Sequence, residues 1–209
     1  MRETPKRYSS PTATARADRS IPPSQRVFNP LTGHLVRPMS MGAARQAVPV
    51  EIRAKDDVTR EDQFQRRHWE KWGVNLMLAY SDLEMRLGKR VVAVKPLWLV
   101  LVPFWAVHPY EILLLPRRHV VRFDALVDRE EEDLGHLQAE LLDRYRQLLG
   151  NRSPVTLEWH GAPKESKGAA HWQLHAHIRP HPETGCAVPL SSEEAAAVLR
   201  DDTIRSRHR

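Results

Sequence analysis

From about residue 59 onward, the chain alternates between helical and strand-like patterns of apolar and polar positions. Apolar residues at helical spacing predict helices over 59–72, 81–87, 128–149 and 191–200. Short aliphatic and β-branched runs predict five strands over 90–94, 97–102, 111–115, 155–160 and 171–178. The connections are short. We therefore expect an α+β domain, an antiparallel sheet of about five strands with one long helix packed on it.

Capping signals give the expected ends of these helices. Ser81 and Asp128 are the expected N-caps of the second and third helices, because Glu84 and Glu131 follow them at the capping-box spacing. A glycine directly after each of the first three helices is expected to end it: Gly73, Gly88 and Gly150. The strands over 97–102 and 112–115 are apolar on both faces, so we expect both faces to need cover.

Residues 1–58 differ from the rest of the chain. Seven of the 16 prolines lie in residues 1–50, and periodicity is weak there. We therefore expect residues 1–58 to be a largely disordered basic tail, and residues 59–209 to be the folded domain. Within the tail, residues 26–37 place two short apolar runs on either side of Asn29-Pro30-Leu31-Thr32-Gly33, which predicts a short strand-turn.

Charge and cysteine usage exclude several classes of protein. The formal net charge is +6, and residues 1–50, with eight basic and two acidic side chains, account for all of it. This tail contains only two aromatic residues, Tyr8 and Phe28, which is too few to interleave with its basic side chains, so we expect no specific nucleic-acid partner. The most apolar stretch, 97–107, is too short to span a bilayer, so we expect no membrane partner. The single cysteine, Cys186, excludes an internal disulfide framework and favours a cytoplasmic location.

Candidate chemistry concentrates on three of the 11 histidines. His175 and His177 are two residues apart on a predicted strand, so their side chains point to the same face, about 7 Å apart. His160 ends the preceding strand, and the connection over 161–170 is short enough to pair the two strands as a hairpin. The three imidazoles therefore predict a metal site, and such donors suit zinc or iron better than calcium or magnesium.

The same strand admits a second chemistry. His177 could attack the α-phosphate of a nucleotide and form a covalent intermediate, with Arg179 on the same strand face as a phosphate-binding donor. No histidine follows directly after His177, which leaves that pattern incomplete. The sequence has no glycine-rich phosphate loop and no Gly-x-Ser-x-Gly motif, so kinases, dinucleotide-binding enzymes and serine hydrolases have no support.

Three stretches that flank or contain these histidines resemble the C-terminal half of the galactose-1-phosphate uridylyltransferase family. They are LWLVLVPFWAVHPYEILLLPRRH at 97–119, EWHGAP at 158–163 and HWQLHAH at 171–177, and the likeness extends back through Arg60-Glu61-Asp62. The resemblance implies a histidine-triad-like fold and an iron or zinc cofactor. It also implies that the metal ligands are the positions matching one carboxylate and three histidines of the family: Glu61, His160, His175 and His177.

The family resemblance also implies a function in galactose metabolism. The family's enzymes are nucleotidyltransferases that move UMP between a UDP-hexose and a hexose 1-phosphate through a uridylylated histidine. That histidine belongs to a His-Pro-His motif of the N-terminal half, which is absent from these 209 residues. We therefore expect no catalytic residue here and no independent transfer.

Two alternatives follow from that absence. The first is a truncated, non-catalytic metal-binding domain that pairs with a full-length family subunit as a homo- or heterodimer. The second is a residual histidine-triad nucleotide hydrolase, and only in this case would His177 be catalytic.

Overall fold

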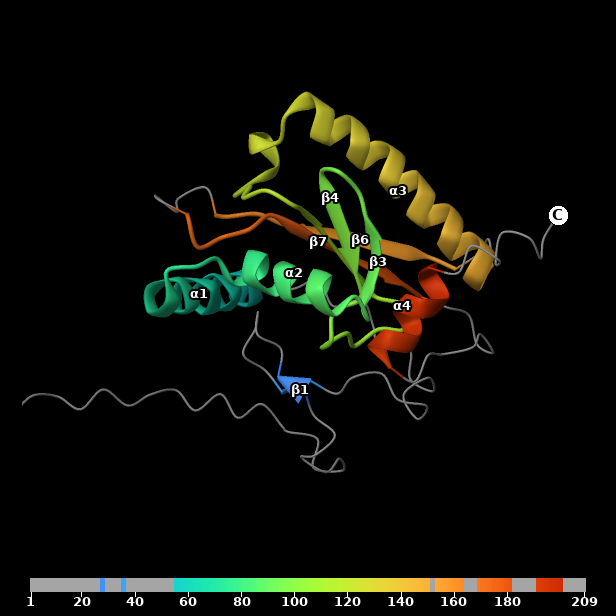
Figure 1. The fold of residues 1–209 in the computed structure, drawn as a ribbon, viewed down its shortest axis with the longest axis horizontal. Coiled ribbons are helices and arrows are strands. Elements are labelled where there is room, and N and C mark those ends of the chain that lie inside the picture. Colours follow the sequence, from blue (N-terminus) through green and yellow to red (C-terminus); the bar gives the residue numbers. More distant parts are fainter. Residues whose placement is uncertain are drawn as a thin grey trace, which may run out of the picture.

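The computed structural model describes residues 55–150, 153–163, 169–181 and 191–200, together with two short strands nearer the N-terminus (Figure 1). These strands, β1 (Val27–Phe28) and β2 (Leu35–Val36), pair antiparallel at the two ends of the strand-turn predicted over 26–37, and the predicted turn between them lies outside the described residues. The rest of residues 1–54 lies outside the described residues. The predicted division of the chain into 1–58 and 59–209 therefore stays a prediction.

The centre of the molecule is a five-stranded antiparallel sheet, as predicted. Its strand order is β3-β4-β5-β7-β6, and every neighbouring pair is antiparallel. The strands are β3 (Val91–Val94), β4 (Trp98–Leu101), β5 (Ile112–Pro116), β6 (Val155–His160) and β7 (His175–Pro180). The predicted hairpin between the strands that hold His160 and His175 is β6–β7. In it, the two histidines lie directly opposite each other.

The last strand is shorter than predicted. The sequence pattern predicted a strand from His171, whereas β7 begins at His175. Two of the residues just before it bond instead to the end of β5 and the segment that follows. The Leu174 N–H donates to the Val120 carbonyl, and the Gln173 amide donates to the Pro116 and Arg118 carbonyls. These hydrogen bonds replace the strand ladder there.

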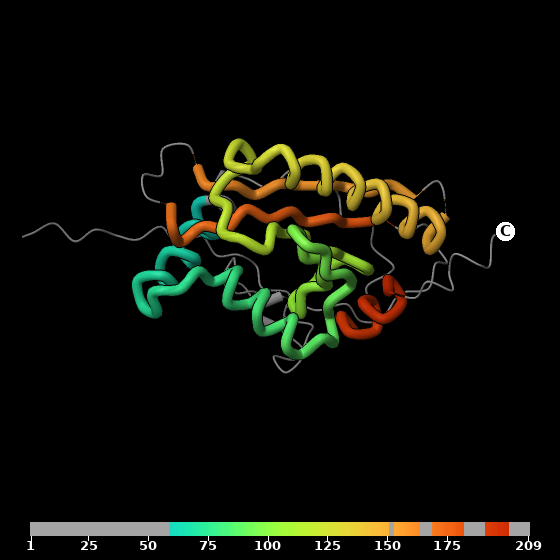
Figure 2. The backbone as a smooth tube through the Cα atoms, turned by 45° about the horizontal axis from the view of Figure 1, so that its top comes forward, coloured from blue at the N-terminus to red at the C-terminus, as the bar shows by residue number. Residues whose placement is uncertain are grey.

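Helices cover both faces of the sheet. They are α1 (Lys55–Trp72), α2 (Leu76–Leu87), α3 (Asp128–Leu149) and α4 (Ser192–Arg200). Apolar side chains of α3 and α4 share one core cluster with residues of β3, β4, β5 and β7, and α2 forms a second cluster against the sheet. Figure 2 shows α3 running along the strands on one side, with α1 and α2 on the other. The sequence predicted the long helix α3 on the sheet, but it did not predict that α1 and α2 form a second layer on the opposite face.

Other elements of this chain bury both faces of the apolar strands β4 and β5. Every residue of β4 and β5 is buried, including Leu99, Val100, Leu113 and Leu114. Successive side chains alternate between the two core clusters, because neighbouring positions of a strand point to opposite faces. These strands therefore need no partner protein to bury them.

The second helix begins earlier than predicted. Asn75, rather than Ser81, is the N-cap of α2, and its side-chain oxygen accepts hydrogen bonds from the N–H groups of Met77 and Leu78. The Ser81 hydroxyl donates to the Met77 carbonyl inside the helix, and Glu84 binds Arg90. The Ser-x-x-Glu spacing was therefore misleading, because both side chains have other partners.

The start of α3 differs by one residue. Its N-cap is Val127 rather than Asp128, and the Val127 N–H donates to the Glu130 carboxylate rather than to Glu131. Glu130 is buried and also accepts from the Arg118 guanidinium, which explains why it, and not its neighbour, points back to the helix start. The predicted glycine stops are confirmed: Gly73, Gly88 and Gly150 follow their helices with positive φ.

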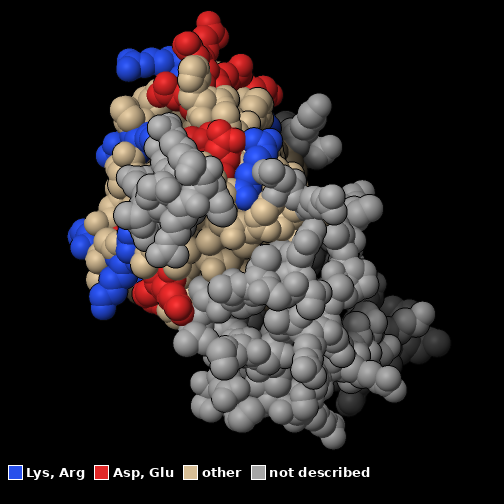
Figure 3. Space-filling view, turned by 90° about the vertical axis from the view of Figure 1, so that its right-hand side faces the viewer, with Lys and Arg blue, Asp and Glu red and all other residues tan. Residues whose placement is uncertain are grey.

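The outer surface carries side chains of both charges. On the face shown in Figure 3, the visible basic side chains form no continuous patch. None of the helices in the described ranges has the length and the apolar content needed to cross a bilayer.

We expect Asn75→Ala to destabilise the chain by about 1 kcal/mol, the usual effect of losing an N-cap. The substitution removes the acceptor for two helix N–H groups and also the amide that donates to the Ala170 and His171 carbonyls. Urea unfolding measures the loss. Asn75→Ser is the matched control, because its hydroxyl oxygen can still cap the helix while the amide donor is lost. Equal losses in the two variants would show that the cap contributes nothing.

Candidate metal centre

The three predicted histidines lie on one face at the free edge of the sheet. His175 and His177 alternate with Ala176 on β7, so both imidazoles point to the face that α1 covers. His160, opposite His175 on β6, joins them. The ring centroid of His160 is 5.0 Å from that of His175 and 5.1 Å from that of His177. One ligand nitrogen from each ring lies within 4.8 Å of the others, and all three residues are buried.

A carboxylate from a distant part of the chain completes the group. Glu61 lies on α1 and is fully buried. Its Oε2 is 2.8 Å from His160 Nδ1, and its Oε1 is 2.9 Å from His175 Nε2. The structure thus brings together all four residues of the predicted ligand set.

Glu61 is held as an anion. Burial on its own raises the pKa of this carboxyl, but the neighbouring His175 and His160 outweigh it, so the pKa lies well below its usual range. The Gln65 amide, one helical turn further along α1, donates a hydrogen bond of 3.2 Å to Glu61 Oε1. An ionised carboxylate beside imidazoles supplies the negative charge that a divalent cation prefers.

In two of the histidines, Nδ1 contacts an oxygen atom of the protein, and Nε2 is left for the group formed by the three rings. His175 Nδ1 is 2.8 Å from the Gln173 carbonyl, which can only accept, so this nitrogen is the donor. His177 Nδ1 is 2.9 Å from Glu111 Oε1. The Nε2 atoms of His175 and His177 are buried and make no hydrogen bond within the described residues.

These nitrogens fit a metal ion. His175 Nε2 lies 2.9 Å from Glu61 Oε1 without hydrogen-bond geometry, which suits two atoms that occupy neighbouring coordination positions around one metal ion. Burial and the nearby Arg179 outweigh the hydrogen bond to Glu111 and lower the pKa of His177 to about 3. A neutral imidazole with a free lone pair is the form that binds metal. The three histidines therefore form a group that could hold a metal ion.

Three supporting contacts were not predicted from the sequence. Glu111 binds His177, the Gln173 carbonyl orients His175, and Asp62 Oδ1 lies 2.7 Å from His171 Nε2. The last contact ties α1 to the segment before β7 and so fixes the neighbouring Glu61. The contacts of Glu111 and Asp62 join segments 66 and 109 positions apart, which no spacing in the sequence signals. The contact between Gln173 and His175 is local, but it depends on the backbone turn just before β7.

Arg179 lies on the same strand face as His177, as predicted. Its Nη1 is 2.6 Å from Glu158 Oε2, and its Nε is 3.2 Å from Glu111 Oε1. The guanidinium is therefore already paired with two carboxylates, rather than directed at an open anion site.

Known proteins match the part of the chain that forms this centre. A family model for the C-terminal domain of galactose-1-phosphate uridyl transferase matches residues 57–183. The galactose-1-phosphate uridylyltransferase of Rattus norvegicus is 42% identical over 128 residues, which is 60% of this chain and 34% of that protein. The Haemophilus influenzae protein of the same name is 38% identical over 125 residues, 60% of this chain and 36% of that protein.

A solved structure agrees on the fold. A uridylyltransferase structure superposes with a TM-score of 0.63 at 23% identity, and the match covers 73% of this chain and 52% of that one. The chain spans about a third of the length of the curated relatives that it matches. The family model alone covers more than half of the 209 residues. The chain therefore belongs to the galactose-1-phosphate uridylyltransferase family, in the part that corresponds to its C-terminal domain.

Proposed function

We propose that this chain binds one zinc or iron ion through Glu61, His160, His175 and His177. The observation that supports this most directly is the convergence of three buried histidine nitrogens within 4.8 Å, beside a buried carboxylate. Nitrogen donors with one carboxylate suit zinc or iron, whereas calcium and magnesium prefer oxygen donors. The ion would hold α1 against β6 and β7, and its role is structural.

We further propose that the chain contributes the metal-bearing domain to uridylyl transfer between a UDP-hexose and a hexose 1-phosphate. Relatives that match over 60% of the chain have the name of that enzyme, which supports this reaction. The 209 residues lack the His-Pro-His motif expected for the nucleophile. A full-length family subunit in a mixed dimer would therefore supply the catalytic histidine. We place this activity in the cytoplasm, in keeping with the single cysteine.

A nucleotide hydrolase that uses His177 is the second candidate. The buried Nε2 of His177, which lacks a hydrogen-bond partner within the described residues, favours it, because a nucleophile needs that lone pair. The surroundings favour it less. A phosphate beside His177 would meet Glu111 and Glu158, which pair with the nearby Arg179 and would repel an anion.

Incubation with radiolabelled UDP-glucose separates these candidates. We expect the purified chain alone to form no acid-labile uridylyl adduct, because no histidine in it has the expected nucleophile context. A full-length family enzyme serves as the positive control for adduct formation.

An adduct that is lost in His177→Ala and kept in His136→Ala would contradict the metal-domain proposal and establish the hydrolase. His136 is the matched control because it is an exposed histidine on α3, away from the centre. The pairing proposal is tested by mixing the chain with a full-length family enzyme. Failure of the two to form a mixed dimer in native mass spectrometry would refute it.

A further inference from the structure

Glu111 is a buried carboxylate outside the predicted ligand set, and N–H groups lie within hydrogen-bond distance of both of its oxygens. Oε1 accepts from Arg179 Nε at 3.2 Å and lies 2.9 Å from His177 Nδ1. Oε2 accepts from the backbone N–H groups of Val107 at 3.1 Å and of His108 at 3.3 Å. The backbone N–H groups and the guanidinium can only donate. A proton on either oxygen would therefore face a fixed donor, so Glu111 is ionised.

An ionised Glu111 decides which nitrogen of His177 carries the proton. A carboxylate only accepts, so His177 Nδ1 must donate to it. The proton is then absent from Nε2, whose lone pair is left facing His160 and His175. We propose that Glu111 is a positioning residue, which holds His177 in the one tautomer that can bind a metal through Nε2. This role rests on the metal centre proposed above.

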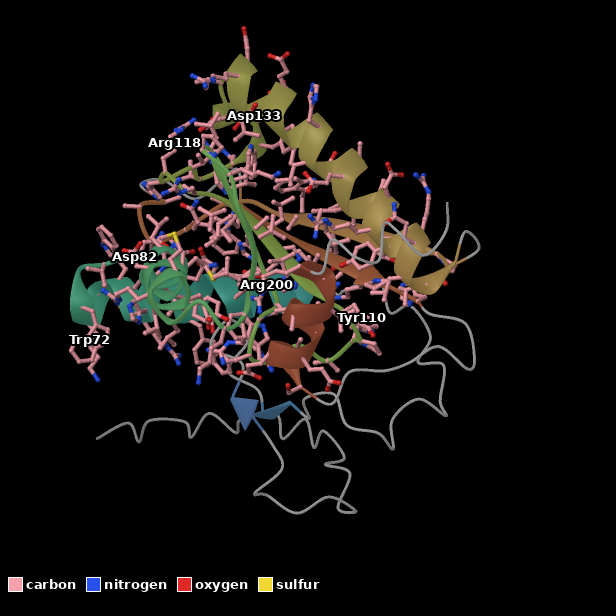
Figure 4. The ribbon with its side chains drawn as sticks, turned by 45° about the vertical axis from the view of Figure 1, so that its right-hand side comes forward. Trp72, Asp82, Tyr110, Arg118, Asp133 and Arg200 are labelled. Carbon is pink, nitrogen blue, oxygen red and sulfur yellow. The ribbon has the colours of Figure 1, made fainter. Side chains whose placement is uncertain are left out.

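The loop before β5 holds Glu111 in place. Tyr110, which is labelled in Figure 4, adopts a left-handed backbone conformation with φ of 58°. This conformation is costly for a residue with a side chain and persists only when its surroundings enforce it. The Tyr145 hydroxyl, buried on α3, donates a hydrogen bond of 2.7 Å to the Tyr110 carbonyl. The position of Glu111 on one face of the sheet is thus fixed by a contact with the helix on the other face.

Glutamine cannot reproduce this arrangement, although its shape is nearly the same. Its NH2 group would replace either Oε1 or Oε2, and each of these positions already faces two N–H groups. An NH2 group beside His177 would donate to Nδ1 and move the imidazole proton to Nε2. An NH2 group on the other side would oppose two backbone donors. The first outcome reverses the tautomer of His177. The second keeps an acceptor beside His177 but breaks the hydrogen bonds that hold the side chain to the loop before β5. Neither creates a cavity.

The first test compares metal affinity in the full 209-residue chain. Zinc affinity, measured by competition with a chromophoric chelator, should fall about 10–100-fold in Glu111→Gln, the usual effect of losing a partner that orients a ligand. Glu84→Gln is the matched control, because it removes another buried carboxylate that pairs with an arginine, Arg90, yet contacts no histidine. We expect wild-type zinc affinity in that variant. Equal affinity in Glu111→Gln and the wild type would overturn the proposal, as would an equal loss in both variants.

The second test reads the tautomer directly in the wild type and does not depend on how the variant folds. In the zinc-loaded chain with 15N-labelled histidine, long-range 1H–15N correlation spectra should show a proton on Nδ1 of His177 and zinc on Nε2. Zinc on Nδ1 would overturn the proposal. A wild-type chain that binds neither zinc nor iron would overturn the metal centre and this role together. Zinc binding that Glu111→Gln leaves intact removes only the role of Glu111.

Discussion

His175→Ala is expected to abolish stoichiometric metal binding and to lower the stability of the chain by roughly 3–5 kcal/mol, because it removes one partner of a buried charge together with the metal ion. The variant removes one ligand and leaves the fully buried, ionised Glu61 with one imidazole fewer. Metal analysis after dialysis should find about one zinc or iron ion per chain in the wild type and almost none in the variant. Thermal unfolding measures the stability.

A chelator makes this experiment sharper. It should lower the unfolding temperature of the wild type towards that of His175→Ala and should leave the variant unchanged, because the variant has no metal to lose. His136→Ala, on the exposed surface of α3, controls for the loss of a histidine as such. A wild type that contains no metal, together with unchanged stability in His175→Ala, would refute the proposed centre.

Trp98→Ala is expected to destabilise the domain by about 3–5 kcal/mol, the range for truncating a buried tryptophan. Trp98 is fully buried on β4, its Nε1 donates to the Glu130 carbonyl of α3, and its ring packs edge-on against Trp159. The substitution therefore leaves a cavity and removes a hydrogen bond between the sheet and the long helix. Urea unfolding followed by circular dichroism measures the change in midpoint at constant slope.

Trp72→Ala provides the matched comparison for the same substitution. Trp72 is the last residue of α1, is 61% exposed and points away from the body of the domain (Figure 4). Its loss should change stability by about 0.5 kcal/mol or less, as is usual for a surface position. Similar losses in the two variants would mean that Trp98 does not lie in the core between β4 and α3.

The alternation of side chains along a strand explains why part of the centre was predictable. A two-residue spacing fixes His175 and His177 on one face whatever the rest of the fold does. The short connection between the two strands then placed His160 beside them, and the structure has the expected hairpin. The helix ends at Gly73, Gly88 and Gly150 were predictable for the same kind of reason, because the left-handed turn that follows a helix favours glycine.

The capping errors mark the limit of local patterns. Ser81 and Glu84 have the spacing of a capping box, yet both are buried inside α2, where Glu84 pairs with Arg90. A side chain that can cap a helix can equally bind a partner that the fold brings near it. The choice between them depends on which residues surround it after folding, and the sequence pattern does not contain that information.

By itself, the sequence determined the elements, the sheet class and the shared face of His175 and His177, because backbone geometry within a helix or strand fixes where each side chain points. Spacing did not decide which distant residues meet there. The family resemblance implied Glu61, and the tertiary structure added Glu111 and placed both carboxylates beside the histidines. Glu61 reaches His160 across 99 positions of sequence, and Glu111 reaches His177 across 66. Those contacts follow from the packing of α1 and the loop before β5 against the sheet. Burial of apolar surface drives that packing, and spacing along the chain does not encode it.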